Sequence, residues 1–194
     1  SNKKVLDEKG LAVPESWSDL LKPELKGQIS TAHPSTSGTA FTTLWTQVVL
    51  GGSENAGIDY MKKMHANVLQ YTKSGTDPGQ IAGRGEVAVG LVFSHDCVKY
   101  RDEGMKDLVV SFPKEGTGYE IGGVALVKNS KHSEAAKKYI DWAISADAQN
   151  LGQTVGSNQI LTNPNAKTND KMAKLDEINL INYDFAAAAA AKPE

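Results

Sequence analysis

Cysteine is nearly absent from this sequence, because Cys97 is the only one among 194 residues. A single cysteine excludes an intramolecular disulfide and a zinc site built from several cysteines. Its neighbours Asp96 and Val98 lie in an apolar-flanked segment, which favours a buried, inert thiol. A nucleophilic cysteine would need a histidine base, and His95, two positions away, would usually point elsewhere. The pattern therefore argues against a cysteine-dependent enzyme.

An excess of either charge and a long apolar run are also missing. The 21 basic and 23 acidic residues give a net charge of -2, without the basic block that nucleic acid or an anionic membrane surface would attract. No apolar run approaches the length of a membrane-spanning helix. The first residues, Ser1 to Lys4, are polar, so we expect no signal peptide in this chain, as in a mature exported protein or a recombinant fragment. We expect a globular chain without a nucleic-acid partner.

Along the chain, segments with a strand-like residue pattern alternate with segments that have a helix-like pattern. Residue patterns and turn residues predict strands near 29–30, 68–72, 87–93, 108–112 and 124–127. They predict helices over 40–50, 53–65, 80–84, 98–104 and 133–144. Strands that alternate with helices in this way are typical of an α/β fold with a parallel sheet. In such sheets ligands bind at the carboxyl ends of the strands, so the loops there are the candidates for a site.

The loop between the first predicted strand and its helix is rich in hydroxyl side chains. It contains Ser35, Thr36, Ser37, Gly38 and Thr39. Free N–H groups and the dipole at the helix start attract anions, the hydroxyls add donors, and glycine lets the backbone approach a ligand. An ordinary helix N-cap is the alternative, but a cap needs only one such residue. The loop therefore predicts an anion-binding site.

Three further polar loops follow predicted strands or precede the next one. They carry Ser74 and Gly75, then His95 and Asp96, and then Glu120 in a glycine-rich stretch. Each has a plainer alternative: Asp96 could cap the next helix, His95 could be a hydrogen-bonded residue at the sheet edge, and Glu120 could be solvated. Because all these loops are expected at one edge of the sheet, they predict a shared ligand site.

Eight segments, in order along nearly the whole chain, carry a family resemblance. They are Val13–Leu21, Lys26–Ile29, His33–Ala40, Gln70–Gly75, Gly85–Gly90, Phe112–Gly118, Ala135–Ala143 with 148–149, and Leu180–Phe185. Together they resemble the solute-binding proteins of ABC importers with the type II periplasmic fold, in the ferric-ion/organophosphate branch. The resemblance implies an α/β lobe with a mixed, mostly parallel sheet flanked by helices, plus part of a second lobe.

The same resemblance implies a division of the chain. Residues 1–113 would form a complete C-terminal-type lobe, and residues 114–194 a return segment and a partial second lobe with C-terminal helices. Because members of the family are longer, we expect a fragment that lacks the first half of the N-terminal lobe. Such a truncated chain could self-associate.

The resemblance also implies roles for the loop residues. Ferric binders of the family use adjacent tyrosines near 155–159, where this chain has Asn158 and no tyrosine pair. The segments Ser94–Asp96 and Thr117–Gly123 instead look like the branch that binds phosphorylated sugars. In that branch His95, Asp96 and Glu120 would bind sugar hydroxyls. The hydroxyl-rich loop at 35–39 would bind the phosphate, assisted by the loop at 74–75.

These implications lead to one expected function and three alternatives. We expect a non-enzymatic, extracytoplasmic component of an ABC importer, periplasmic or a cell-surface lipoprotein, with no cofactor and no metal. It would bind a small anionic solute, a sugar phosphate or an organophosphate or phosphonate, and deliver it to a permease in the inner membrane. The alternatives are a ferric-ion-binding protein, an enzyme that uses His95 and Asp96, and a fragment that binds no ligand by itself.

Overall fold

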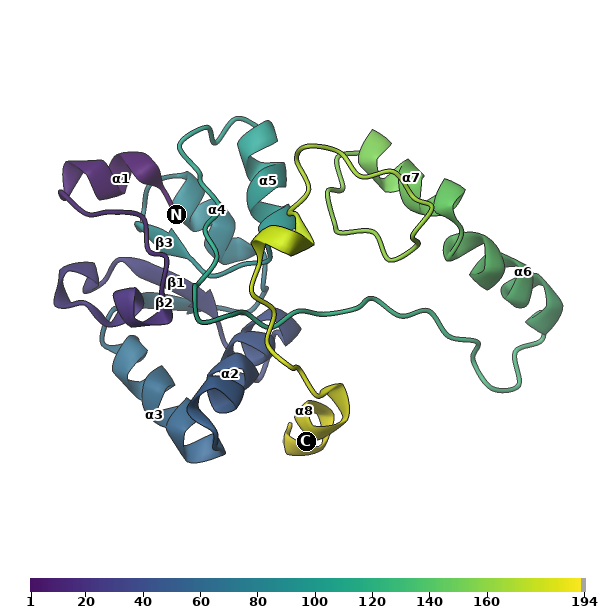
Figure 1. Cartoon of the computed structure of the whole chain (residues 1–194), viewed down its shortest axis with the longest axis horizontal. Helices are drawn as coiled ribbons and strands as arrows, with labels where there is room; N and C mark the ends of the chain where they lie inside the picture. The colour runs from purple at the N-terminus through teal and green to yellow at the C-terminus, as the bar shows by residue number, and fades with distance from the viewer. Residues whose placement is uncertain (193–194) are drawn as a thin grey trace.

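The computed structural model describes residues 1–192 and contains a small parallel sheet. Its strands are β1 (Ile29–Ala32), β2 (Val68–Thr72) and β3 (Val89–Gly90), in the order β2-β1-β3. Both pairings are parallel, with Ile29 opposite Val68 on one side and Val89 on the other. All four residues of the central strand β1 are buried, as expected for a strand covered on both faces. The predicted α/β fold class is confirmed (Figure 1).

Helices cover the sheet and extend beyond it. The α-helices are α1 (Lys3–Glu8), α2 (Gly38–Gly51), α3 (Glu54–His65), α4 (Asp77–Gly83), α5 (Ser94–Asp102), α6 (Ser133–Ala143), α7 (Ala146–Thr154) and α8 (Phe185–Ala191). Short 3₁₀ helices lie at Trp17–Leu21, Pro23–Leu25 and Leu175–Glu177. Serine caps open α2, α3 and α7, where the serine side chain accepts a hydrogen bond from the third backbone N–H of the helix. Within residues 1–192, every helix is too short or too polar to cross a bilayer.

Helix α5 begins earlier than the sequence predicts. We expected it from Val98, but it begins at Ser94, so His95 and Asp96 lie in its first turn rather than in a preceding loop. Asp96 lies in the first turn, where the helix dipole favours a negative charge. The capping alternative for Asp96 is wrong, because Phe93 is the N-cap and no side chain makes a capping hydrogen bond at this end of the helix.

Three strand predictions are wrong wholly or in part. Of the predicted strand 87–93 only Val89–Gly90 pairs, while 108–112 contributes one antiparallel bridge, between Asn2 and Leu108. The stretch 124–127 forms no strand and is exposed. A strand needs a neighbour for its backbone groups, and in the part of the chain described here no segment lies alongside 124–127.

Two apolar clusters hold the sheet between its helices. One joins α1, the first two 3₁₀ helices, α3 and the sheet through Leu6, Leu20, Leu25, Ile29, Met64, Ala88 and Val89. The other joins α4 and α5 to the segments at either side through Ile81, Ala82, Val87, Cys97, Tyr100 and Leu108. These clusters make the carboxyl end of the sheet a rigid support for the loops that follow it.

Residues 114–132 lead from this body to α6 and are named here the outgoing segment. Residues 178–184 lead back to α8 and are named the returning segment, and these two crossing segments meet at one point (Figure 1). The outgoing segment contacts the returning one at Thr117 and Leu180, which form a parallel bridge. Thr117 N–H donates to the Asn179 carbonyl at 2.9 Å, and Ile181 N–H donates to the Thr117 carbonyl at 3.1 Å. Beyond the bridge the returning segment and α8 pack against α2 in a third apolar cluster, formed by Trp45, Ile181, Tyr183 and Ala188 (Figure 1).

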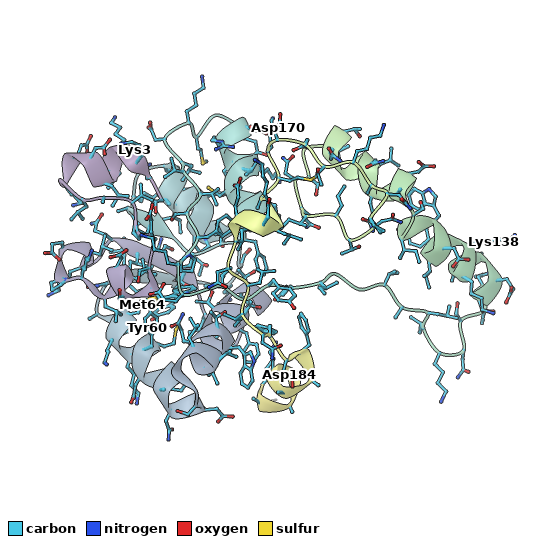
Figure 2. All side chains as sticks on the ribbon, viewed as in Figure 1. Lys3, Tyr60, Met64, Lys138, Asp170 and Asp184 are labelled. Atoms are coloured by element: carbon cyan, nitrogen blue, oxygen red, sulfur yellow. The ribbon has the colours of Figure 1, made fainter. Side chains whose placement is uncertain are left out.

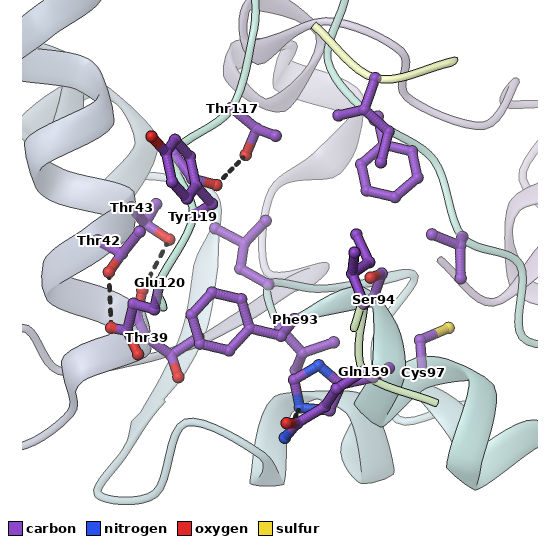
Figure 3. Close-up of a pocket in the computed structure, with 18 of the residues that line it drawn as sticks. Thr39, Thr42, Thr43, Phe93, Ser94, Cys97, Thr117, Tyr119, Glu120 and Gln159 are labelled. Atoms are coloured by element: carbon purple, nitrogen blue, oxygen red, sulfur yellow. Dashed lines mark hydrogen bonds between the residues drawn. The ribbon is translucent and has the colours of Figure 1, made fainter. Parts of the chain in front are cut away.

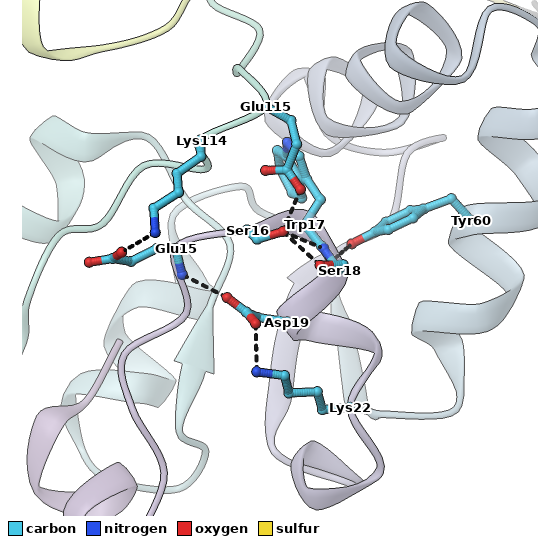
Figure 4. Close-up of polar contacts among 9 residues, drawn as sticks. All are labelled: Glu15, Ser16, Trp17, Ser18, Asp19, Lys22, Tyr60, Lys114 and Glu115. Atoms are coloured by element: carbon cyan, nitrogen blue, oxygen red, sulfur yellow. Dashed lines mark hydrogen bonds and ion pairs between the residues drawn. The ribbon is translucent and has the colours of Figure 1, made fainter.

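The outgoing segment is held to the body by the 3₁₀ helix at Trp17–Leu21 (Figure 4). The indole N–H of Trp17 donates to the Gly116 carbonyl at 2.8 Å, and the Ser16 hydroxyl donates to the Glu115 carboxylate. An exposed ion pair joins Lys114 to Glu15 at 2.8 Å. This set of contacts fixes where the outgoing segment leaves the body.

Helices α6 and α7 lie apart from the sheet, at the far end of the two crossing segments (Figures 1 and 2). None of their residues is buried. Lys138 on α6 stands out from the molecule in Figure 2, whereas Met64 on α3 is enclosed in the core. The predicted division into residues 1–113 and 114–194 stays a prediction, and the last two residues of that range lie outside the described part.

Candidate functional site

The hydroxyl-rich loop folds into the start of α2. Ser37 is the N-cap, and its Oγ accepts from the Ala40 N–H at 3.4 Å. The Ser35 hydroxyl lies 2.7 Å from the Nδ1 of His33. The Thr36 hydroxyl lies 3.2 Å from the His33 carbonyl, with the loop at 73–75 close by. The capping alternative is therefore correct for Ser37, while Thr39 extends into the first turn of the helix.

The loop after β2 packs directly on this helix start. A Cβ atom built on Gly75 would lie 2.4 Å from the Thr39 Oγ1 and 2.7 Å from the Ser37 Oγ. A Cβ atom does not come this close to a non-bonded heavy atom in real proteins, so only glycine allows this approach. The Ser74 hydroxyl lies 2.9 Å from the Thr76 hydroxyl, within its own turn. The structure thus brings the two predicted phosphate-side loops into contact.

A cavity of about 690 Å³ lies at the carboxyl edge of the sheet, between α2, the crossing segments and the 148–162 region (Figure 3). Three of the predicted site residues line it: Thr39, His95 and Glu120. The others do not line it, and they are Ser35, Thr36, Ser37, Gly38, Ser74, Gly75 and Asp96. Its wall therefore joins one residue of the predicted phosphate side to two of the predicted sugar side.

Glu120 is anchored to α2 from the outgoing segment. The Thr42 hydroxyl donates to the Glu120 Oε1 at 2.8 Å (Figure 3). A Cβ atom on Gly38 would lie 3.2 Å from the same oxygen, so the helix start leaves room for the carboxylate. Glu120 is exposed, as the solvated-loop alternative expects, and it also has a hydrogen-bond partner on the cavity wall.

His95 lines the cavity from the first turn of α5, and Asp96 lies beside it outside the cavity wall. The His95 Nε2 lies 3.7 Å from the Asp96 Oδ1, and the imidazole stacks on Phe93 with 5.8 Å between ring centres. Gln159, from the far side of the cavity, brings its Nε2 to 3.5 Å from the His95 Nε2. Burial raises the pKa of the Asp96 carboxyl above its ordinary value, and the nearby charges of His95 and Lys99 only partly oppose this.

Several cavity residues were not predicted from the sequence. They are Thr42, Thr43 and Thr46 on α2, Phe93 before α5, and Gln159. The threonines had a readable signal, since with Thr39 they recur every three or four residues on one face of an otherwise apolar helix. Gln159 had none, because its contribution depends on how a distant segment folds back.

Cys97 and Tyr119 line the cavity and also belong to the packed clusters. Cys97 is buried as expected, with 6% of its surface exposed, and burial raises the pKa of its thiol. Tyr119 and Tyr183 pack on Phe185, with ring centres 5.5 and 5.0 Å from it. Both tyrosines thus pack in the third apolar cluster. Within residues 1–192, no three His, Cys, Asp or Glu side chains are grouped to hold a metal ion.

The chemistry of the cavity wall suits a ligand with several polar groups. Threonine hydroxyls and the free N–H groups at the start of α2 can donate to an anion. The Glu120 carboxylate and the Gln159 carbonyl oxygen can accept from hydroxyl groups. Phe93 adds an apolar surface between these two regions.

Comparison with known proteins gives matches over most of the chain. The family profile described as bacterial extracellular solute-binding protein matches residues 1–179. An uncharacterized protein of Haemophilus influenzae is 43% identical over 175 residues, which cover 89% of this chain and 50% of that protein. The chain spans about half the length of the curated relatives that it matches.

Two solved structures are similar in both fold and sequence. The periplasmic binding protein AfuA from Actinobacillus pleuropneumoniae, with exogenous fructose-6-phosphate bound, matches with a TM-score of 0.89 and 40% identity. The periplasmic binding protein P5PA matches with a TM-score of 0.85 and 32% identity. Each match covers 96% of this chain and 59% of the other.

Proposed function

The chain belongs to the bacterial extracellular solute-binding proteins, and from this premise we propose that it binds a small phosphorylated solute in the cavity at the carboxyl edge of its sheet. The proteins of this family are non-enzymatic components of ABC importers that bind small solutes and interact with membrane permeases. The ligand would be a sugar phosphate or a related organophosphate or phosphonate. A periplasmic location, or attachment to the cell surface as a lipoprotein, belongs to the same proposal.

The observation that carries the proposal is the pairing of two chemistries on one cavity wall. The helix start beside Thr39 offers donors for a phosphate, while Glu120 and His95 offer partners for hydroxyl groups. A cavity of about 690 Å³ is within the range of small-molecule sites. The similarity to a protein solved with fructose-6-phosphate supports the same ligand class for this chain.

Seven predicted site residues that do not line the cavity retain a place in the proposal. Ser37 and Gly38 shape the start of α2, and Gly75 packs against it, so they would present the phosphate-side N–H groups. Ser35, Thr36 and Ser74 belong to the same two loops. Asp96 would act beside His95, from the first turn of α5.

Thermal stability with and without candidate ligands tests the proposal. The chain, and any longer protein that contains it, would be heated with fructose 6-phosphate, fructose, inorganic phosphate or a ferric salt. A ligand at about 100 times its Kd stabilises the folded state by about 2.7 kcal/mol. For a chain of this size that raises Tm by roughly 5–10 °C.

Each arm of this experiment separates one alternative. We expect a shift with the sugar phosphate and a smaller one with either half of it. A shift and a visible charge-transfer colour with the ferric salt alone would favour a ferric-ion-binding protein. A response in the longer protein but not in this chain would mean that the chain does not bind ligand by itself. No shift of the longer protein with any phosphorylated or phosphonate compound would overturn the proposed ligand class.

A further inference from the structure

Two buried threonines one turn apart on α2 face the outgoing crossing segment. Thr42 and Thr46 have only 5% and 1% of their surface exposed, and both line the cavity wall. Figure 3 shows Thr42 beside Glu120. A threonine costs helix stability through its restricted side chain, and it gains nothing from burial unless its hydroxyl is hydrogen bonded. Because both threonines are buried, we expect each hydroxyl to have a hydrogen-bond partner.

Each hydroxyl forms a hydrogen bond with the outgoing segment. The Thr46 hydroxyl donates to the Thr42 carbonyl at 2.7 Å, and its oxygen accepts from the Gly118 N–H at 3.1 Å. The Thr42 hydroxyl donates to the Glu120 Oε1 at 2.8 Å. The two threonines thus hold the segment at two points, one on its backbone and one on its carboxylate.

The close approach of the segment depends on a missing side chain. A Cβ atom on Gly118 would lie 2.5 Å from the Thr46 Oγ1 and 3.1 Å from both a Thr42 methyl carbon and a Tyr183 ring carbon. Any larger residue at this position would push the segment away from α2 and would break both hydrogen bonds. The close contact of this segment with Thr42 and Thr46 therefore requires glycine at position 118.

The Thr42 contact also settles how Glu120 meets the cavity. The segment after Glu120 is exposed, and Gly122 and Gly123 have no neighbours that a Cβ would touch, so nothing beyond it restrains the carboxylate. Thr42 occupies one oxygen of Glu120, and the second oxygen stays available to a ligand. A carboxylate held in this way loses less conformational freedom on binding than a free one.

We propose that Thr42 and Thr46 are positioning residues for the ligand: they hold Gly118 and Glu120 so that the Glu120 carboxylate faces the cavity ready to accept ligand hydroxyl groups. This inference rests on the proposed function, and it identifies the residues that orient Glu120 for ligand binding. It concerns the hydroxyl-bearing part of the solute and leaves the phosphate part to the start of α2.

A double-mutant cycle in titration calorimetry with fructose 6-phosphate tests the inference. Thr42→Val keeps the shape and removes the donor, and we expect it to weaken binding by about 5- to 10-fold, the worth of one hydrogen bond. Thr42→Ser keeps the hydroxyl and should restore binding. Because Thr42 acts through Glu120, the double variant with Glu120→Gln should bind no more weakly than Glu120→Gln alone. Thr154→Val, which removes a hydroxyl bonded within α7, is the matched control and should bind as the unchanged chain does.

Amide hydrogen exchange in the ligand-free chain provides a second measurement that does not depend on binding. Thr46→Val should speed the exchange of the Gly118 amide, since that N–H loses its acceptor. Unchanged exchange at Gly118, or effects of Thr42→Val and Glu120→Gln that multiply in the double variant, would overturn the inference. If neither the unchanged chain nor a longer protein that contains it binds a phosphorylated solute, the proposed function fails. If the unchanged protein binds and Thr42→Val binds equally well, only the inference about Thr42 fails.

Discussion

Asp96 is the residue at which stability and binding are expected to oppose each other. Its side chain is only 13% exposed, and burial raises the pKa of the carboxyl despite the charges of His95 and Lys99. An acid whose pKa is raised on folding binds its proton more tightly in the folded state than in the unfolded state. Its contribution to the free energy of unfolding is therefore fully present below its ordinary pKa and is lost as the pH rises through the raised value. At neutral pH the ionised Asp96 destabilises the fold.

Asp96→Asn should accordingly raise Tm at neutral pH, because the uncharged amide is cheaper to bury. The gain should shrink as the pH falls through the raised pKa, where Asp96 itself becomes neutral. The same change should weaken sugar-phosphate binding by about 2- to 10-fold, through the loss of the charge beside His95, because Asp96 itself does not line the cavity. Thermal melts across pH and titration calorimetry measure the two effects. A variant that lost stability at neutral pH would contradict this account of the residue.

His95, Asp96 and Glu120 each have a structural alternative when taken singly, and the family resemblance is what selects them as candidate site residues. Their partners could not be chosen in the same way. Thr42 contacts Glu120 across 78 positions of the chain, and Gln159 approaches His95 across 64. Such contacts depend on the path of the crossing segments, which no local pattern encodes.

At the scale of elements, prediction succeeded where the signal is local. Ser37 and Ser53 cap the helices that follow them, and Gly52 ends α2 in the left-handed conformation that glycine favours. It failed for the apolar stretches 108–112 and 124–127, because a strand forms only beside a partner and composition does not specify one. The early start of α5 is a smaller error of boundary.

The contact between the loop at 74–75 and the start of α2 provides a prediction at this scale. Gly75→Ala would place a methyl group against Thr39 and Ser37, so one of the two elements must shift. We expect a loss of about 1–3 kcal/mol in the free energy of unfolding, as for overpacked sites. Binding of inorganic phosphate should weaken with it, because the N–H groups at the helix start would no longer be aligned.

Gly123→Ala is the matched control for that variant. A Cβ atom on Gly123 meets nothing within 4 Å, and the residue does not line the cavity. The control should leave both the denaturant midpoint and phosphate binding unchanged. Equal effects of the two substitutions would show that the packing of Gly75 against α2 is unimportant.

At the scale of the whole molecule, the chain combines a packed body with a less protected arm. The body holds the sheet, α1 to α5 and the three apolar clusters, with α8 on α2. The arm holds α6 and α7, in which Trp142 and Leu151 are 49% and 53% exposed. Sequence periodicity predicted α6 correctly, but it could not indicate that the apolar face of this helix would remain uncovered within residues 1–192.

Amide hydrogen exchange of the isolated chain should separate the arm from the body. Short helices without buried residues are marginal in water, so α6 and α7 should have protection factors on the order of 10 or less. Helix α2 buries Ala40, Thr42 and Trp45 among others, and its amides should approach the protection of global unfolding, on the order of a thousandfold or more.

Protection of α6 and α7 equal to that of α2 would contradict this contrast and would mean that something covers the arm in solution. The predicted self-association of the chain is one such cover, because exposed Trp142 and Leu151 can pack against a second copy. The other possible cover is the body of the same chain, onto which the arm would fold back. Sedimentation velocity at several protein concentrations separates these two cases. Protection that rises together with the weight-average mass would come from self-association, whereas protection in a monomer at every concentration would require the arm to fold back on its own body.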